Sequence, residues 1–160
     1  MAKNPYISGV GGWLGFLIFG LTILSPLSGF GKLSSEFRDA LEQFPQLAGN
    51  SQWQNYKLMS WLIFTTSAVI SFSAGYRLWK AHFNESVRFA ILALWLAGPL
   101  ANILYMASAF LIFGDSVGGN ATAKMIGGTI ASCVAAGIWT AYLMRSVRVR
   151  NTYNLPYSGQ

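Results

Sequence analysis

Four long stretches of this chain contain no Asp, Glu, Lys, Arg or His. They cover residues 9–30, 58–76, 89–113 and 125–144. A helix of about 20 apolar residues crosses a hydrocarbon core about 30 Å thick. Only 10% of all residues are charged, against about 25% in a typical soluble domain. The sequence therefore predicts an all-α integral membrane protein, a single domain over residues 1–160 built as a four-transmembrane-helix bundle.

The excess of basic over acidic residues does not indicate that the chain binds nucleic acid. The net charge is +6, but the basic residues are separated by long uncharged runs instead of forming a stripe on one face. A single cysteine, Cys133, permits no intrachain disulfide. The chain has only one histidine, His82, so its cysteine and histidine are too few to form a His/Cys metal cluster. We expect no metal, no cofactor and no nucleic-acid partner.

The longest polar segment lies between the first two predicted spans. Its apolar residues recur at helical spacing, at Leu33, Phe37, Leu41 and Phe44. Acidic and basic residues occupy the other faces, and Pro45 ends the pattern. We predict a short amphipathic helix over about 34–44, either lying on the membrane surface or capping the bundle; a partner-binding helix is the alternative. Pro26 is predicted to bend or end the first span.

Small and polar residues mark the second and third spans. Ser67, Ser71 and Gly75 recur every four residues, which favours close helix packing. Gly98-Pro99 interrupts the third span and is predicted to free the carbonyl of Trp95. Asn102 must pair its amide, because an unpaired amide in hydrocarbon costs several kcal/mol. We predict one candidate site in these spans, and two interpretations of it remain open, a helix-packing site or a ligand site. Its residues are Ser67, Ser71, Pro99 and Asn102.

The distribution of positive charge predicts the orientation. If the N terminus is cytoplasmic, the cytoplasmic segments carry Lys3, Arg77, Lys80, Arg88, Arg145, Arg148 and Arg150. The outer segments then carry Lys32, Arg38, Lys57 and Lys124. Seven against four favours this arrangement, since cytoplasmic loops are enriched in Lys and Arg. We predict that both termini are cytoplasmic.

The C-terminal tail, residues 145–160, begins at Arg145, the first charged residue after the last apolar stretch. Arg145, Arg148 and Arg150 are candidates for contacts with anionic lipid head groups, worth about 1 kcal/mol each. Orientation alone does not need the residues between and after these arginines, namely Ser146, Val149, Thr152 and Tyr153. They predict a folded tail that caps the cytoplasmic ends of the helices.

Two end motifs carry a family resemblance. The first is Gly9-Val10-Gly11-Gly12-Trp13-Leu14, continued by Gly20-Leu21 and Ser25-Pro26-Leu27. The second runs Trp139-x-x-Tyr142-Leu143-x-x-Ser146-x-Arg148-Val149-x-x-Thr152-Tyr153. The chain resembles a bacterial family of small four-span membrane proteins, domain of unknown function 2569. The resemblance covers nearly the whole chain and implies the bacterial cytoplasmic (inner) membrane, with no assigned activity.

No arrangement of residues along the chain points to catalysis. The predicted spans contain no carboxylate pair, and the chain has no H-E-x-x-H motif. A G-x-S-x-G match occurs at residues 114–118, but it falls in a short Gly-rich turn between two predicted spans and not after a strand, where a nucleophile elbow forms. We therefore predict a non-enzymatic interaction or accessory protein whose partners are membrane lipids, another membrane protein or a second copy of itself. The alternative is a binder or carrier of a lipid-like or small apolar ligand, held in a cavity beside Asn102.

Overall fold

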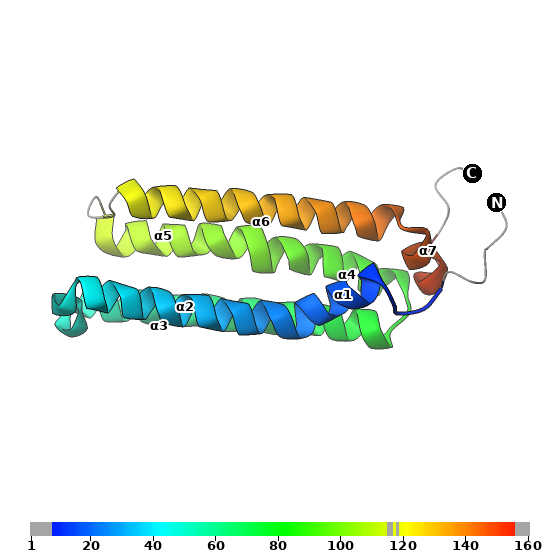
Figure 1. Cartoon of the computed structure of the whole chain (residues 1–160), viewed down its shortest axis with the longest axis horizontal. Helices are drawn as coiled ribbons and strands as arrows, with labels where there is room; N and C mark the ends of the chain where they lie inside the picture. The colour runs from blue at the N-terminus through cyan, green and yellow to red at the C-terminus, as the bar shows by residue number, and fades with distance from the viewer. Residues whose placement is uncertain (1–7, 115–116, 118, 156–160) are drawn as a thin grey trace.

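The computed structural model describes residues 8–114, 117 and 119–155. Within them the chain is helical and has no strand. The elements are α1 (Trp13–Phe19), η1 (Gly20–Leu24), α2 (Ser25–Gln43), η2 (Pro45–Gly49), α3 (Ser51–Lys80), α4 (Asn84–Trp95), η3 (Leu96–Leu100), α5 (Ala101–Phe113), α6 (Gly119–Arg145) and α7 (Val147–Tyr153). The long helices lie side by side, and α1 and α7 lie at the same end (Figure 1). Lys3, Asp115 and the last part of the predicted tail, 156–160, lie outside the described residues.

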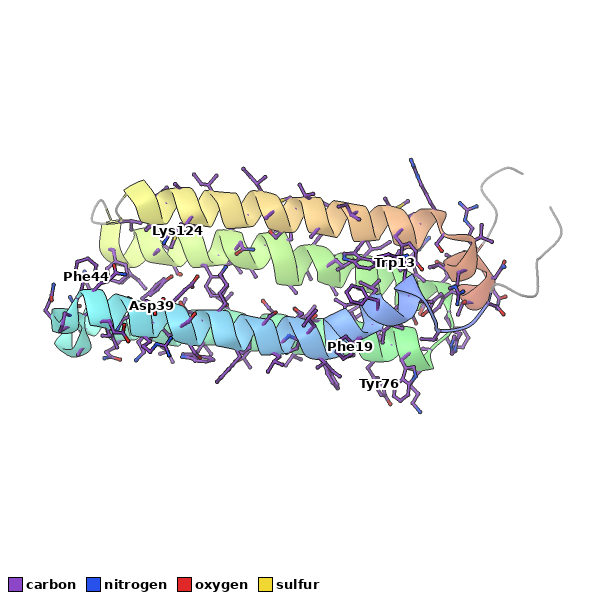
Figure 2. The ribbon with its side chains drawn as sticks, in the orientation of Figure 1. Trp13, Phe19, Asp39, Phe44, Tyr76 and Lys124 are labelled. Atoms are coloured by element: carbon purple, nitrogen blue, oxygen red, sulfur yellow. The ribbon has the colours of Figure 1, made fainter. Side chains whose placement is uncertain are left out.

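Four helices are long and apolar enough to cross a membrane. They are Trp13–Gln43, Ser51–Lys80, Asn84–Phe113 and Ala121–Arg145, so the predicted all-α membrane bundle is confirmed. Large apolar side chains cover its outside, with Leu111 86% exposed. In Figure 2, Trp13 and Tyr76 lie towards the α7 end, and Asp39, Phe44 and Lys124 lie towards the opposite end.

The first helix runs without a break from α1 through η1 to the end of α2. The prediction of a separate helix over 34–44 on the membrane surface is therefore wrong, although these residues are helical and amphipathic. Pro26 does not end the helix, because the preceding turn η1 is π-helical and the Ser25 N–H bonds to the carbonyl of Gly20 five residues back. The apolar face packs on the start of α3 instead, where Leu33, Phe37 and Trp53 are buried together.

The spans pack in the order of the sequence. The first helix packs on α3, α3 packs on α4 and α5, and these two pack on α6. The first helix and α6 are brought together by aromatic rings near the α7 end, where Trp139 lies 6.4 Å from Trp13 and 6.1 Å from Phe16 between ring centroids. Towards the middle of the bundle, cavities lie between the first helix and the later ones.

The tail folds into α7 and closes one end of the bundle, which confirms the prediction for residues 147–155. Val149 and Tyr153 are buried in the same apolar cluster as Leu14 and Leu78. The Tyr153 hydroxyl donates to the carbonyl of Leu78 at the end of α3. The N–H of Gly9 donates to Thr152 Oγ1 at 3.0 Å. The two end motifs of the sequence therefore meet in space, 143 residues apart in the chain.

Candidate functional site

Two adjoining cavities lie between the helices. The first, of about 170 Å³, is bounded by α2, α3, the start of η3 and α5. The second, of about 320 Å³, lies nearer the α7 end between the first helix and α4, η3 and α6. Ser25 and Ala97 line both cavities, so the two adjoin, and we refer to them together as the cleft. Together their volumes fall within the range of about 300–1,000 Å³ that ligand pockets occupy.

The wall formed by η3 and α5 carries Asn102. Its Nδ2 donates to the carbonyl of Gly98 at 3.1 Å and to Ser132 Oγ on α6 at 3.2 Å. The carbonyl that the Asn102 amide reaches is thus that of Gly98, one turn earlier in the same span. Gly98 and Pro99 belong to the π-helical turn η3, and a free carbonyl at Trp95 stays a prediction. Within the described chain no donor reaches Asn102 Oδ1, so this half-buried amide keeps an acceptor at the cavity wall.

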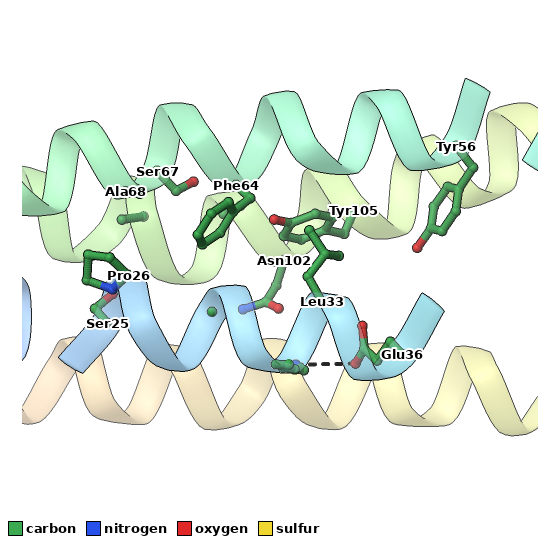
Figure 3. Close-up of a pocket in the computed structure, with 14 residues that line it drawn as sticks. Ser25, Pro26, Leu33, Glu36, Tyr56, Phe64, Ser67, Ala68, Asn102 and Tyr105 are labelled. Atoms are coloured by element: carbon green, nitrogen blue, oxygen red, sulfur yellow. Dashed lines mark ion pairs between the residues drawn. The ribbon is translucent and has the colours of Figure 1, made fainter. Parts of the chain in front are cut away.

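The predicted site residues divide between the two cavities. Ser67 on α3 and Asn102 on α5 line the first (Figure 3). Ser71 lines the second. Pro99 is buried beside the cleft but does not line it. The structure therefore places three of the four residues along one cleft.

Sequence reasoning missed the polar residues at the end of the first cavity that lies farther from α7. We call this end the outer end. These residues are Lys32 and Glu36 on α2, Tyr56 on α3 and Tyr105 on α5. Tyr105 lies three residues after Asn102, on the same face of a helix, and this spacing could have pointed to it. The sequence places Lys32 in the polar segment between two spans and Glu36 on a predicted surface helix, and no pattern in the sequence joins them to Asn102.

Ser71 completes a hydrogen bond that Pro26 cannot make. Pro26 has no N–H for the carbonyl of Leu21, five residues earlier, and the N–H of Ser25 is already bonded to Gly20. The Ser71 hydroxyl donates to Leu21 O at 2.9 Å and is buried. One buried side chain on α3 therefore satisfies the backbone of the π-helical turn in the first helix.

Replacing Ser71 with alanine is expected to destabilise the fold by about 1–3 kcal/mol, because the Leu21 carbonyl would lose its donor in an apolar interior. Thermal unfolding in mild detergent measures this loss. Ser73→Ala, two residues along the same helix and only partly buried, is the matched control and should change the midpoint little. Equal effects of the two substitutions would contradict the assigned role of the Ser71 hydroxyl.

The three tail arginines have different surroundings. Arg145 is exposed at the end of α6. The Arg148 guanidinium lies over the N-terminal glycines, with Nη1 only 3.1 Å from where a Cβ on Gly11 would be. Arg150 Nη2 donates to the carbonyl of Met144 at 3.3 Å. Arg148 thus packs against the N-terminal segment, Arg150 links α7 to the end of α6, and Arg145 is the most accessible of the three.

Residues 7–154 match the family described as protein of unknown function (DUF2569). The chain belongs to this family. The match runs from the glycines before α1 to the end of α7, so the helical cap is part of the family's DUF2569 region. No curated protein and no solved structure matches the chain.

Proposed function

We propose that this DUF2569 protein is a non-catalytic membrane protein that holds a lipid-like ligand in the cleft between its helices. The observation that carries the proposal is the pair of adjoining cavities at Ser25 and Ala97. The lining of the cleft combines apolar side chains with a few polar groups, as the lining of small-molecule sites does. Among the described residues no group of three or more His, Cys, Asp or Glu is placed to hold a metal ion.

The proposed location is the bacterial cytoplasmic membrane, with both termini in the cytoplasm. The described basic residues of the predicted cytoplasmic segments lie at the α7 end, where Arg77 and Lys80 end α3 and Arg145 ends α6. Cytoplasmic ends of membrane helices are enriched in such residues. Arg145 then lies at the depth of anionic lipid head groups.

A tryptophan in place of Ser25 tests the ligand site. Ser25 is exposed and lines both cavities, so a large ring there should fill the cleft without disturbing the buried core. We expect about a tenfold loss of co-purified lipid, which corresponds to about 1.4 kcal/mol of lost affinity. The measurement is native mass spectrometry of protein purified in mild detergent.

Leu27→Trp is the matched control, because Leu27 is two residues away, 67% exposed and outside both cavities. It should leave the bound lipid unchanged. Equal lipid in the wild type and in both variants would remove the support for a ligand in the cleft.

A second candidate function is an accessory protein that packs against another membrane protein or a second copy. The observation that favours it is the outer face of α6. Ile130, Val134 and Ile138 on this face are 57–63% exposed, and a Cβ on Gly127 or Gly137 would meet nothing within 4 Å. Small residues allow close helix approach in a membrane. Cross-linking in native membranes through cysteines placed on this face distinguishes a protein neighbour from lipid.

A further inference from the structure

The cleft differs in chemistry from one end to the other. Its outer end holds Lys32, Glu36 and the two tyrosines Tyr56 and Tyr105. Figure 3 shows Glu36 and both tyrosines gathered towards that end of the first cavity, with Ser25 and Ala68 towards the other. Beyond Ser25 the second cavity is mainly apolar and reaches Phe16 and Trp139. A ligand that fits both ends must be amphiphilic, with its polar head at the outer end.

The charged residues at the outer end balance each other. Lys32 Nζ and Glu36 Oε1 are 3.9 Å apart on one turn of α2, and their side chains are 65% and 57% exposed. Exposed pairs of this kind contribute only about 0.2–1 kcal/mol, so each partner remains available to a ligand. No other residue that lines the two cavities is charged. The lining is neutral overall but presents one cation and one anion a few ångströms apart.

The depth of this pair matches that of a lipid head group. Lys32 is the first charged residue after the uncharged stretch 9–31 that begins the first span. On α3, Lys57 next to Tyr56 precedes the uncharged stretch 58–76. Charged side chains at the ends of spans lie where the hydrocarbon core meets the head groups. The polar end of the cleft is therefore at head-group level, and the apolar end extends into the hydrocarbon region.

The cleft also has access to the bilayer. The first helix packs on α3, and α6 packs on α4 and α5, so the first and last spans form the two rims of the cleft. The ring contacts of Trp139 with Trp13 and Phe16 close these rims near the α7 end. A lipid can enter from the side without leaving the membrane plane, and one of its chains can remain in the bilayer.

We propose that the ligand is a zwitterionic phospholipid, with its phosphate at Lys32, its ammonium group at Glu36 and one acyl chain in the apolar cavity. This inference rests on the proposed function and specifies its ligand. A lysine ammonium binds phosphate as a point charge, and a carboxylate accepts charge-assisted hydrogen bonds from an ammonium group. A head group with only a negative charge would meet Lys32 but be repelled by Glu36.

The experiment compares two lipids with identical chains, phosphatidylethanolamine and phosphatidylglycerol, titrated into delipidated protein and measured by native mass spectrometry. The wild type should bind phosphatidylethanolamine about tenfold more tightly, a difference of about 1.4 kcal/mol. Glu36→Gln should abolish this preference or reverse it, because the cleft then carries a net positive charge. Lys32→Gln should weaken the binding of both lipids.

The neighbouring pair Arg38 and Glu42 supplies the control. It is also four residues apart on α2, with Arg38 Nε 3.8 Å from Glu42 Oε1 and exposures of 71% and 70%, but it does not line the cleft. Arg38→Gln and Glu42→Gln should leave the lipid preference unchanged.

The outcomes separate the two proposals. If lipid binding falls in Ser25→Trp but the wild type shows no preference for phosphatidylethanolamine, the cleft binds lipid and the zwitterionic assignment is wrong. An unchanged preference in Glu36→Gln also overturns the assignment. If neither lipid binds and Ser25→Trp has no effect, the proposed function itself fails.

Discussion

Replacing Tyr153 with alanine is expected to detach α7 from the bundle and lower stability by about 3–5 kcal/mol, the usual cost of deleting a buried aromatic ring. Tyr153 is 1% exposed and belongs to the apolar cluster that includes Leu14, Leu78 and Leu143. Its ring stacks on His82 with centroids 5.8 Å apart. One side chain at the end of the chain therefore contacts residues from the first, second and fourth spans.

Two measurements together test this role. Thermal unfolding in detergent reports the global loss, and hydrogen exchange over 147–153 reports whether α7 opens. Tyr153→Phe keeps the ring but removes the donor to Leu78 O, so it should cost a smaller amount, about 1–3 kcal/mol. Tyr76→Ala on α3 is the control, since Tyr76 is 49% exposed. Slow exchange of α7 in Tyr153→Ala would show that other contacts hold the cap.

The same contact has a predictable dependence on pH. Burial raises the pKa of Tyr153 above its ordinary value near 10, and Tyr142 adds to the shift. The folded state therefore favours the neutral phenol, and its contribution to stability is complete below about pH 10. It declines as the pH rises through that value, because the unfolded chain ionises first. Tyr153→Phe should lose this alkaline dependence.

Charge and hydropathy along the chain were enough to predict the spans, and the residues after Arg145 that orientation does not need predicted the folded tail. Uncharged stretches are a strong signal, since a charged side chain inside the bilayer is costly and therefore rare. The helices nevertheless extend beyond the predicted spans at several ends. In the second span, the helix begins at Ser51, where Asn50 Oδ1 accepts from the N–H groups of Gln52 and Trp53. Helix ends follow such local caps, not the limits of the apolar run.

The first helix and the cleft show what the sequence pattern did not reveal. Polar residues after Gly31 were interpreted as a loop followed by a separate helix, but the helix continues because its apolar residues Leu33 and Phe37 pack on α3. The Ser71 bond to Leu21 spans 50 residues. A cavity depends on which helices are neighbours and how closely they approach, and this spatial order is not encoded in the period of any single helix.

Gly75 is the residue for which a small substitution should have an unusually large effect. A Cβ at this position would lie 2.5 Å from Thr22 Cγ2, 3.2 Å from the carbonyl oxygen of Ile18 and 3.2 Å from Leu21 Cβ. Thr22 cannot turn away freely, because its hydroxyl donates to Ile18 O at 2.8 Å. Any side chain at position 75 must therefore push α3 away from η1.

We expect Gly75→Ala to destabilise the protein by about 1–3 kcal/mol, and Gly75→Leu by more, as in other overpacked interiors. This sign opposes helix propensity, which favours alanine over glycine by about 1 kcal/mol in a helix interior. Gly137→Ala on α6 isolates that propensity effect, because a Cβ there meets nothing within 4 Å. Thermal unfolding should show a lower midpoint for Gly75→Ala and an unchanged or higher one for Gly137→Ala.

Because separating α3 from η1 also breaks the Ser71 bond to Leu21, Gly75→Ala and Ser71→Ala combined should cost less than the sum of the two single substitutions. A fully additive double variant would show that the two contacts hold the helices independently.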